Sequence, residues 1–479
     1  MSGRLPYDPR PWRIRRDSAL GNSSMRDTLQ RVAGRLSKAK STAYGDYQIA
    51  GKWRLAGVAA KRRAISQIDE LVGQVIGEIE RHGGKVHRAR DAAEAVRCVV
   101  EVAQKNGVKL VVKSKSMVTE EIELNKGLED AGVQVVETDL GEYIIQLAHE
   151  KPSHILAPAI HRNRGQVKEL FDVEADRQGM AHLANADIEQ LTQFARQQLR
   201  QKFLSADMGV TGGNFLVAET GTIVLITNEG NADMVTSLPP LLVSIVGIEK
   251  IVGTWDDLGY LLQQPALSGV GQRLSSYTTF VSGPRDKSAM DGPDQWHVVL
   301  LDNGRRNLVG TPEESILSCI RCGACLNVCP VFRQIGGHAY GSVYPGPIGI
   351  VVSANLDPSM PSFLDLASQA CSMCYACTEV CPMDIPLADE ILTLRNHRVK
   401  TMAEPLLVRR TYETWGRLWS TKAGYQKTIR IARLGQRFLI QKKKLRWAPG
   451  LFGGWLKTRD MPLIPPETFR EWWAKTHGE

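Results

Sequence analysis

The sequence reads CIRCGACLNVCP from residue 319 to residue 330, and CSMCYACTEVCP from residue 371 to residue 382. Both stretches follow the spacing Cys-x2-Cys-x2-Cys-x3-Cys-Pro, and each cysteine of the first has a counterpart 52 positions later. Together they contain eight of the nine cysteines in a chain of 479 residues. The segment is therefore an internal duplication that gathers closely spaced thiols.

Two-cluster bacterial ferredoxins use this spacing to hold [4Fe–4S] clusters. Three neighbouring cysteines bind one face of a cubane, and the fourth reaches across to the other cluster. The predicted ligands of the first cluster are Cys319, Cys322, Cys325 and Cys381. The predicted ligands of the second cluster are Cys371, Cys374, Cys377 and Cys329. Since every iron then has a cysteine ligand, both clusters are expected to relay electrons rather than to bind a substrate.

Structural zinc and disulfides are the alternatives for these cysteines. Structural zinc sites have four ligands and often include histidine, whereas each run here places too many thiolates too close together. Disulfides are rare in reducing compartments, and a chain of this length does not need them to fold. The sequence therefore favours two [4Fe–4S] clusters. The ninth cysteine, Cys98, is expected on a helix as a small apolar residue.

The formal charge of +9 is concentrated in one segment. Residues 411–460 contain twelve lysines and arginines against two carboxylates, so the rest of the chain is nearly neutral. Basic residues interleaved with tryptophan are typical of contact with an anionic membrane surface or an acidic partner protein. Nucleic acid ranks last, because no standard binding motif is present. Six of the ten tryptophans follow residue 410, namely Trp415, Trp419, Trp447, Trp455, Trp472 and Trp473.

The sequence indicates a cytoplasmic protein. Residues 1–16 contain five arginines but no apolar segment of a secretory signal. No uncharged apolar run approaches the length that crosses a bilayer. The basic C-terminal region could contact the inner face of the membrane peripherally, or it could dock on a partner protein. Docking on a partner protein is the slightly favoured hypothesis.

Short apolar runs alternate with helical patterns through the first half of the chain, which predicts βαβ units and a mainly parallel sheet. The expected strands of this half are 85–87, 108–112, 133–137 and 155–157. After helices within 166–203, glycine and turn residues become more frequent, which predicts additional strands in mixed orientation. Those expected strands are 215–218, 222–227, 241–246, 277–281 and 298–301. The glycine-rich residues 209–213 fit neither a dinucleotide fingerprint nor a phosphate loop, and are interpreted as a turn.

Four parts of the chain follow from these patterns. They are an N-terminal arm (1–50), an α/β domain (51–305), an α-helical two-[4Fe–4S] ferredoxin-type domain (306–400) and a helical, basic, tryptophan-rich C-terminal region (401–479). Residues 336–349, between the two cysteine runs, form a longer loop than a minimal ferredoxin needs. Because long ordered loops tend to be functional, this one is expected to cover a cluster or contact a partner.

A ligand pocket is predicted in the α/β domain. Lys113 and Lys115 follow an expected strand and precede a helix, where anions often bind at the carboxyl edge of a sheet. Two polar turns are further candidates, one containing Thr220, Gly221 and Thr222 and the other containing Asn228. Ordinary hairpin chemistry is the favoured explanation of both turns.

Three stretches resemble the lactate-utilisation (LUD) domain: KSKSMVTEEIELN (113–125), ETGTIVLITNEGN (219–231) and HVVLLDNGR (297–305). With the cysteine segment and basic tail behind them, the chain resembles the iron–sulfur subunits of bacterial L-lactate oxidation systems. The resemblance implies a fold of the NagB/RpiA/CoA-transferase type. It also implies electron transport during oxidation of L-lactate to pyruvate, without enzymatic activity of this chain alone. The implied partners are a cysteine-rich subunit of the heterodisulfide-reductase type and a smaller LUD-domain subunit.

Two other functions remain open at this point. The LUD domain itself could bind and oxidise a small hydroxy acid, or serve as a ligand-binding module with electron transfer for another oxidoreductase. CoA transferases of similar fold use a glutamate nucleophile, for which Glu219 and Glu229 are the nearest candidates. Lactate oxidation needs no such nucleophile, so neither residue is assigned a catalytic role.

The cysteine spacing predicts about eight irons per chain, since each of two cubanes has four. Anaerobic iron and sulfide analysis, with EPR of the dithionite-reduced protein, should show two interacting clusters. L-lactate in place of dithionite should leave the isolated chain oxidised, because no organic redox cofactor motif accompanies the clusters. Reduction by L-lactate alone would contradict this and place the oxidising site within the chain.

Overall fold

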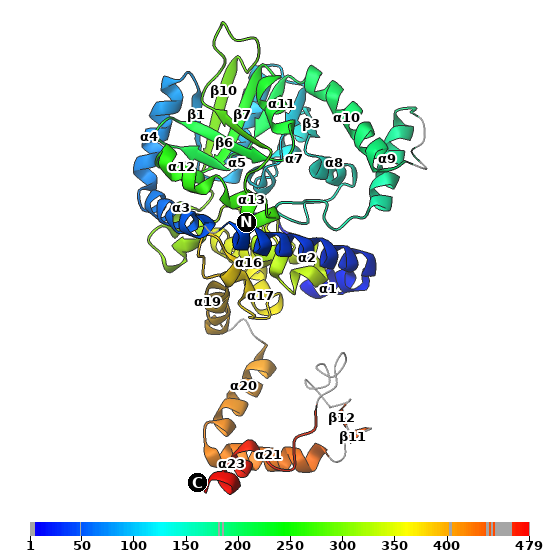
Figure 1. Ribbon diagram of the computed structural model, residues 1–479, viewed down its shortest axis with the longest axis vertical. Helices are drawn as coiled ribbons and strands as arrows, with labels where there is room; N and C mark the ends of the chain where they lie inside the picture. Colours follow the sequence, from blue (N-terminus) through cyan, green and yellow to red (C-terminus); the bar gives the residue numbers. More distant parts are fainter. Residues whose placement is uncertain are drawn as a thin grey trace. The chain divides into compact units, whose positions relative to one another are not determined.

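The computed structural model (Figure 1) describes residues 5–47, 49–180, 183, 186–401, 405–436, 440–441, 444–445 and 462–478. Trp447 and Trp455 of the predicted tryptophan-rich region lie outside the described residues, as do the first four residues of the predicted N-terminal arm. The chain divides into two compact units, Met1–His397 and Arg398–Glu479. The finer boundaries expected at residues 50, 305 and 400 stay predictions.

Six parallel strands form the main sheet of the first unit. Their spatial order is β1 (Lys85–Ala89), β10 (Gln295–Leu301), β7 (Leu241–Gly247), β4 (Met208–Thr211), β2 (Leu110–Lys113) and β3 (Gln134–Glu137). Every residue of β7 is buried, as expected for a parallel strand that is covered on both faces and therefore reads as a continuous apolar run. The predicted α/β class with a parallel sheet is confirmed.

Alternating residues of each strand face different layers, because the side-chain period of a strand is two. Val243 and Ile245 of β7 pack with one set of helices, α5 (Ala92–Lys105), α6 (Met117–Glu121) and α7 (Leu124–Asp130). On the opposite face of the main sheet, Leu242 and Val246 pack with α4 (Ile68–Arg81) and with a second, four-stranded sheet. At the β2–β3 end, this opposite face is covered by α8 (Leu140–Leu147), α9 (Arg164–Arg177), α10 (Ile188–Ser205) and α11 (Asn231–Ser237).

The second sheet has mixed orientation, as the sequence predicts. Its order is β8 (Ile251–Val252), β5 (Phe215–Val217), β6 (Thr222–Thr227) and β9 (Tyr277–Val281). The β5–β6 and β6–β9 pairs are antiparallel, and β5–β8 is parallel. Three helices lie beside this second sheet, because α12 (Trp255–Leu261) contacts β5 and also packs on α3 (Ile49–Ser66) and α13 (Gln264–Val270).

The interpretation of residues 209–213 as a turn is wrong. Gly209 lies inside β4, a central strand of the main sheet, and only Gly212 and Gly213 lie beyond its end. A Cβ on Gly209 would lie 2.2 Å from the carbonyl oxygen of Val235. Glycine therefore permits α11 to approach the strand closely, and the local glycine content reflects packing rather than a turn.

The expected strand at residues 155–157 is also wrong, because this stretch is irregular. β3 is the edge strand of the sheet, and residues 155–157, which follow α8, add no strand beside it. The Nδ1 atom of His154 accepts hydrogen bonds from the backbone N–H groups of Leu156 and Ala157, at 3.0 and 3.1 Å. Ile155 is buried in the core that contains the cysteine segment. The apolar residues that suggested a strand here pack against the cysteine segment instead.

The cysteine segment is helical, and the N-terminal helices pack on it. Its elements are η3 (Pro312–Ser318), α14 (Ala324–Val328), α15 (Phe332–Ile335), η4 (His338–Tyr340), α16 (Gly346–Leu356), α17 (Pro361–Gln369), α18 (Ala376–Val380) and α19 (Leu387–Lys400). Helix α2 (Ser23–Asp46) contacts α13, α14 and α15, while α1 (Trp12–Gly21) contacts α15 and η4. The described part of the N-terminal stretch is thus built into the first unit.

The second unit contains α20 (Leu406–Trp419), α21 (Lys422–Gln436), the short pair β11 (Ile440–Gln441) and β12 (Lys444–Leu445), and α23 (Phe469–His477). None of the helices described in this unit has a buried residue. Leu407, Tyr412 and Trp415 of α20 are more than half exposed. The helical prediction is confirmed for the described residues, and none of the described helices is both long and apolar enough to cross a bilayer.

A buried arginine connects the α/β part of the first unit to the cysteine segment. Arg305 forms two bonds of 2.8 Å with the carboxylate of Glu121 and a third contact with Glu249. The hydroxyl of Tyr344, from the loop between the cysteine runs, donates to the same Glu121 carboxylate. All four side chains are at least 97% buried. Burial raises the pKa of Glu249, but neighbouring cations, first of all Arg305, outweigh burial and lower it to about 2.

Replacing Arg305 with leucine should destabilise the protein by about 3–5 kcal/mol, because two buried carboxylates lose their countercharge. Arg306→Leu is the matched control, since Arg306 pairs with Asp69, which is 73% exposed, and should cost about 0–1 kcal/mol. Thermal unfolding followed by circular dichroism in anaerobic buffer compares the two. Equal losses in both variants would show that the buried pairs contribute no more than a surface pair.

Candidate iron–sulfur centre and adjoining cavity

The two cysteine loops have the same backbone geometry, as an internal duplication requires. Arg321 and Met373, 52 positions apart, both have positive φ, of 59° and 56°. Gly323 and Tyr375 form a second such pair, with φ of 74° and 64°. Each loop then enters a five-residue helix, α14 or α18. The left-handed positions turn the chain sharply, so that successive cysteines face the same side of the loop.

The cysteines surround two small cavities, and each cavity takes its fourth cysteine from the other repeat. The first is lined by Cys319, Cys322, Cys325 and Cys381. The second is lined by Cys371, Cys374, Cys377 and Cys329. These are the two sets of ligands expected from the spacing. Cys98 belongs to neither, and lies half-buried on α5.

The spread of the sulfur atoms distinguishes a cluster from a single metal ion. A zinc ion bound at about 2.3 Å keeps all of its sulfur ligands within about 4.6 Å of one another. Among the described residues, only Glu150, His161 and His338 have three potential ligand atoms within 4.8 Å, and no cysteine belongs to that group. The cysteine sets are therefore too wide for one zinc ion and fit a larger group with four corners.

The surroundings of the thiols fit a bound cluster. Backbone N–H groups of Arg321 and Met373 donate to Cys319 and Cys371, at 3.4 and 3.3 Å, and such bonds stabilise negative charge on sulfur. Burial raises the pKa of the Cys322 thiol to about 11. The free thiol is thus protonated at neutral pH, and binding of iron must release its proton.

The two cysteine sets differ in their distance from the protein surface. The first is covered by the 154–157 segment, since a Cβ on Gly323 would lie 2.9 Å from the His154 ring. In the second set Cys374 is exposed, and the adjacent Tyr375 is 39% exposed. A group bound in the second set therefore lies nearer to the protein surface than one bound in the first.

A cavity of about 440 Å³ adjoins the first cysteine set. It opens at the carboxyl ends of β2 and β4, where Ser114 and Gly212 follow the strands, and helix α2 closes one side. Ligands commonly bind at this edge of an open parallel sheet. The cavity and the first cysteine set share a wall made of Ile155, Ile320, Arg321 and Cys322.

Only part of the pocket predicted from the sequence lies at this cavity. Lys115 and Asn228 line it. Thr220, Gly221 and Thr222 do not, because the β5–β6 turn packs on α4 instead. A Cβ on Gly221 would lie 2.8 Å from the backbone nitrogen of Ile79, and glycine's φ of 64° suits that close approach. For this turn the ordinary hairpin explanation holds.

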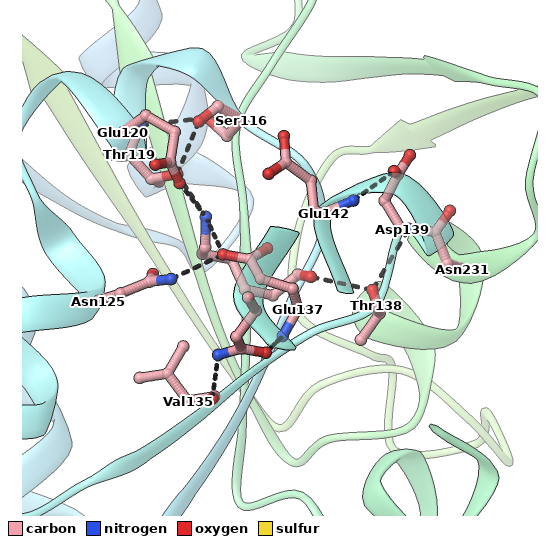
Figure 2. A network of polar contacts seen from close by, with 12 residues as sticks. Ser116, Thr119, Glu120, Asn125, Val135, Glu137, Thr138, Asp139, Glu142 and Asn231 are labelled. Atoms are coloured by element: carbon pink, nitrogen blue, oxygen red, sulfur yellow. Dashed lines mark hydrogen bonds and ion pairs between the residues drawn. The ribbon is translucent and has the colours of Figure 1, made fainter. Parts of the chain in front are cut away.

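Lys113 is likewise absent from the cavity wall and is held in an internal ion-pair network. Its Nζ lies 2.7 Å from Glu137 and 3.1 Å from Glu120, and donates to the Thr119 hydroxyl at 2.9 Å. Figure 2 shows Glu137 also accepting from Asn125, at 2.7 Å. Burial lowers the pKa of Lys113, but the surrounding carboxylates, first of all Glu137, raise it overall. Lys113 is a structural cation that links β2, β3 and α6.

The cavity contains charged residues that the sequence patterns did not select. Arg321 lies between two cysteines of the first run, and its guanidinium lies 4.4 Å from the centre of the Tyr344 ring. Lys250 follows the buried Glu249 and approaches the carbonyl of Cys319 at 3.5 Å. Arg321 could have been found from the sequence only by its position between two cysteines of the first run. No sequence pattern points to Lys250, because its place at the cavity depends on the fold around β7.

Glu229 lies at the cavity and Glu219 does not. Burial, together with the nearby Asp139, raises the pKa of Glu229 to about 7. Its Oε2 accepts a hydrogen bond of 3.1 Å from the backbone N–H of Leu140. Glu219 is exposed and accepts from the backbone N–H of Trp255, at 3.0 Å. Of the two glutamates considered from the sequence, Glu229 alone is placed to contact a ligand of this cavity.

Comparison with known proteins agrees with the fold and the site. Residues 72–301 match the family model of the LUD domain, and residues 315–385 match that of the 4Fe-4S dicluster domain. Both matches fall inside the ranges 51–305 and 306–400 expected from the sequence. The molecule is thus a LUD-domain protein with an iron–sulfur domain of the dicluster type.

Curated relatives cover nearly the whole chain. Lactate utilization protein B of Oceanobacillus iheyensis is 41% identical over 468 residues, covering 97% of this chain and 96% of its own. Lactate utilization protein B of Bacillus subtilis is 39% identical, with 95% and 94% covered. An Escherichia coli protein named uncharacterized electron transport protein YkgF is 40% identical, with 89% of each chain covered. The chain belongs to the lactate utilization protein B family, and the resemblance seen in the sequence is confirmed.

The raised pKa of Glu229 predicts a pH-dependent contribution to stability. Between pH 4.5, its ordinary pKa, and about 7, the folded protein keeps a proton that the unfolded chain has released, so stability falls as pH rises. Glu229→Gln removes this contribution. The variant should therefore gain thermal stability relative to wild type as pH rises from about 5 to about 8. Glu219→Gln is the control, and identical pH profiles for the two variants would contradict the prediction.

Proposed function

We propose that this protein is the iron–sulfur electron-transfer subunit of a system that oxidises L-lactate to pyruvate. The observation that carries the proposal is the pair of four-cysteine cavities, each completed by the other repeat. Bound there, two [4Fe–4S] clusters supply one-electron storage and transfer. The exchange of fourth cysteines keeps the two sites adjacent, as a relay requires.

The surroundings of the two sites support a direction for the relay. The first cysteine set is enclosed and borders the cavity of the α/β domain. The second set has Cys374 at the surface. Electrons therefore enter on the cavity side, at the first set, and leave toward a partner that docks over residues 372–375. The names of the relatives support lactate as the source of those electrons.

The chain acts as a subunit rather than as a complete enzyme in this proposal. Oxidation of lactate releases two electrons, whereas each cluster accepts one, and no motif for an organic redox cofactor is present in the sequence. The partners proposed are a cysteine-rich subunit of the heterodisulfide-reductase type and a smaller LUD-domain subunit. One of them would supply the two-electron chemistry.

The second unit is proposed as a docking element. Its described helices expose Leu407, Tyr412, Trp415 and Trp472 and contain no buried residue. Exposed aromatic residues on a basic segment suit an acidic partner surface, with an anionic membrane at the inner face as the alternative. Either contact would cover apolar surface that these helices leave open.

Replacing Cys325 or Cys377 with serine should abolish lactate-dependent electron transfer, because each removes a ligand from one of the two sets. The measurement is anaerobic reduction by L-lactate of the complex assembled with its partner subunits. The decrease in iron–sulfur absorbance and the EPR spectrum monitor the reduction. Cys98→Ser is the matched control and should transfer electrons as wild type does, since Cys98 lies in neither set. Undiminished transfer in either cluster variant would argue against a relay through both sites.

A further inference from the structure

The cavity beside the first cysteine set has an excess of positive charge. Among the described residues that line it, four are cations and two are carboxylates, namely Arg35, Lys115, Lys250 and Arg321 against Asp139 and Glu229. Lys250 is 6% exposed, so solvent screens its charge poorly. A concave site lined by one predominant sign of charge concentrates ligands of the opposite sign. These cations favour an anion both in the cavity and in the adjoining cysteine set, which Lys250 and Arg321 also border.

Two buried polar atoms at the cavity lack a hydrogen-bond partner among the described residues. One is the Nη1 of Arg321, a donor, and the other is the Oδ1 of Asn231, an acceptor. Asn231 is 94% buried, so bulk water does not satisfy it freely. Buried polar groups are nearly always paired, and each exception requires an explanation. A ligand that offers both an acceptor and a donor would satisfy both atoms.

The two carboxylates narrow the chemistry of the anion. Asp139 and Glu229 would repel a group with several negative charges, such as a phosphate, but accept a hydrogen bond from a neutral hydroxyl. Burial and the nearby Asp139 raise the pKa of Glu229, so a further negative charge beside it is unfavourable. A monoanion with a hydroxyl beside its carboxylate suits this mixed lining, with the carboxylate bound by the cations and the hydroxyl near Glu229 and Asn231.

We propose that this cavity binds a small 2-hydroxy carboxylate, with Lys115 and Arg321 holding the carboxylate and the Oδ1 of Asn231 accepting from the hydroxyl next to Glu229. The choice of a hydroxy acid rests on the proposed function, and the presence of an anion site rests on the charges and unpaired atoms alone. The volume of about 440 Å³ lies within the range of small-molecule sites, roughly 300–1,000 Å³.

The cavity borders the first cysteine set, which places a bound acid beside the first site of the proposed relay. Cys322 and Arg321 line both the cavity and the first cysteine set, so the bound acid lies against that wall. The inference concerns binding and orientation only, and no bond of the acid is broken by residues of this chain. The two-electron acceptor belongs to a partner, which reaches the acid through the open side of the cavity.

Isothermal titration of the full-length protein with its iron–sulfur clusters, under anaerobic conditions, tests the inference. L-lactate should bind, and propionate, which lacks only the hydroxyl, should bind about tenfold more weakly. Lys115→Ala should weaken L-lactate binding by at least about tenfold. Lys109→Ala is the matched control, because Lys109 is exposed at the opposite end of the same strand, and should leave binding unchanged.

Asn231→Leu provides a second, independent variant, in which the preference for L-lactate over propionate should shrink because the acceptor of the hydroxyl is lost. L-lactate should also alter the EPR signal of the reduced first cluster, including in Cys377→Ser, in which the relay is broken but the cavity is intact. Absence of L-lactate binding in a protein that still relays electrons with its partners would overturn the inference and leave the proposed function standing. Phosphate binding as tightly as L-lactate would overturn the hydroxy-acid class.

Discussion

The arrangement of the first unit depends on one buried guanidinium. Arg305 follows the last strand of the main sheet and binds Glu121 and Glu249, which come from two other parts of the α/β domain. Tyr344 brings the loop of the cysteine segment to the same carboxylate. A charge buried this deeply is tolerated only when its partners are fixed, so these segments have little freedom to move apart. The cavity and the first cysteine set are adjacent as a consequence.

The packing around this contact explains why the α/β domain and the cysteine segment occur together. The 154–157 segment covers the first cysteine loop, and the loop containing His338 contacts Lys151 and Ser153 just before that segment. The second cysteine loop has no such cover at Cys374. One site is thereby enclosed beside a polar cavity, and the other reaches the surface at Cys374. The two cysteine runs thus share their spacing but differ in their surroundings.

Much of the fold was predictable where the local pattern and the final environment agree. Strand β6 occurs at the residues expected, 222–227, because its apolar run is buried as a strand between turns. Gly209 and Ile155 were misjudged for the opposite reason. Glycine usually marks a turn, but at Gly209 it admits a neighbouring helix, and Ile155 is apolar because of the cysteine segment rather than a strand partner. Such contacts join residues far apart in the chain, which no local pattern records.

The sequence alone determined the chemistry of the cysteine segment, since the spacing of Cys319 to Cys329 and of Cys371 to Cys381 restricts the groups that four thiols can hold. The tertiary structure decided which polar residues face a ligand. Lys113 and Lys115 look alike in sequence, yet one is used in ion pairs with Glu120 and Glu137 while the other lines the cavity. The physical reason is that β2 ends at Lys113, so Lys115 belongs to the loop beyond the strand, and the packing and charge pairing around each lysine are set by distant segments.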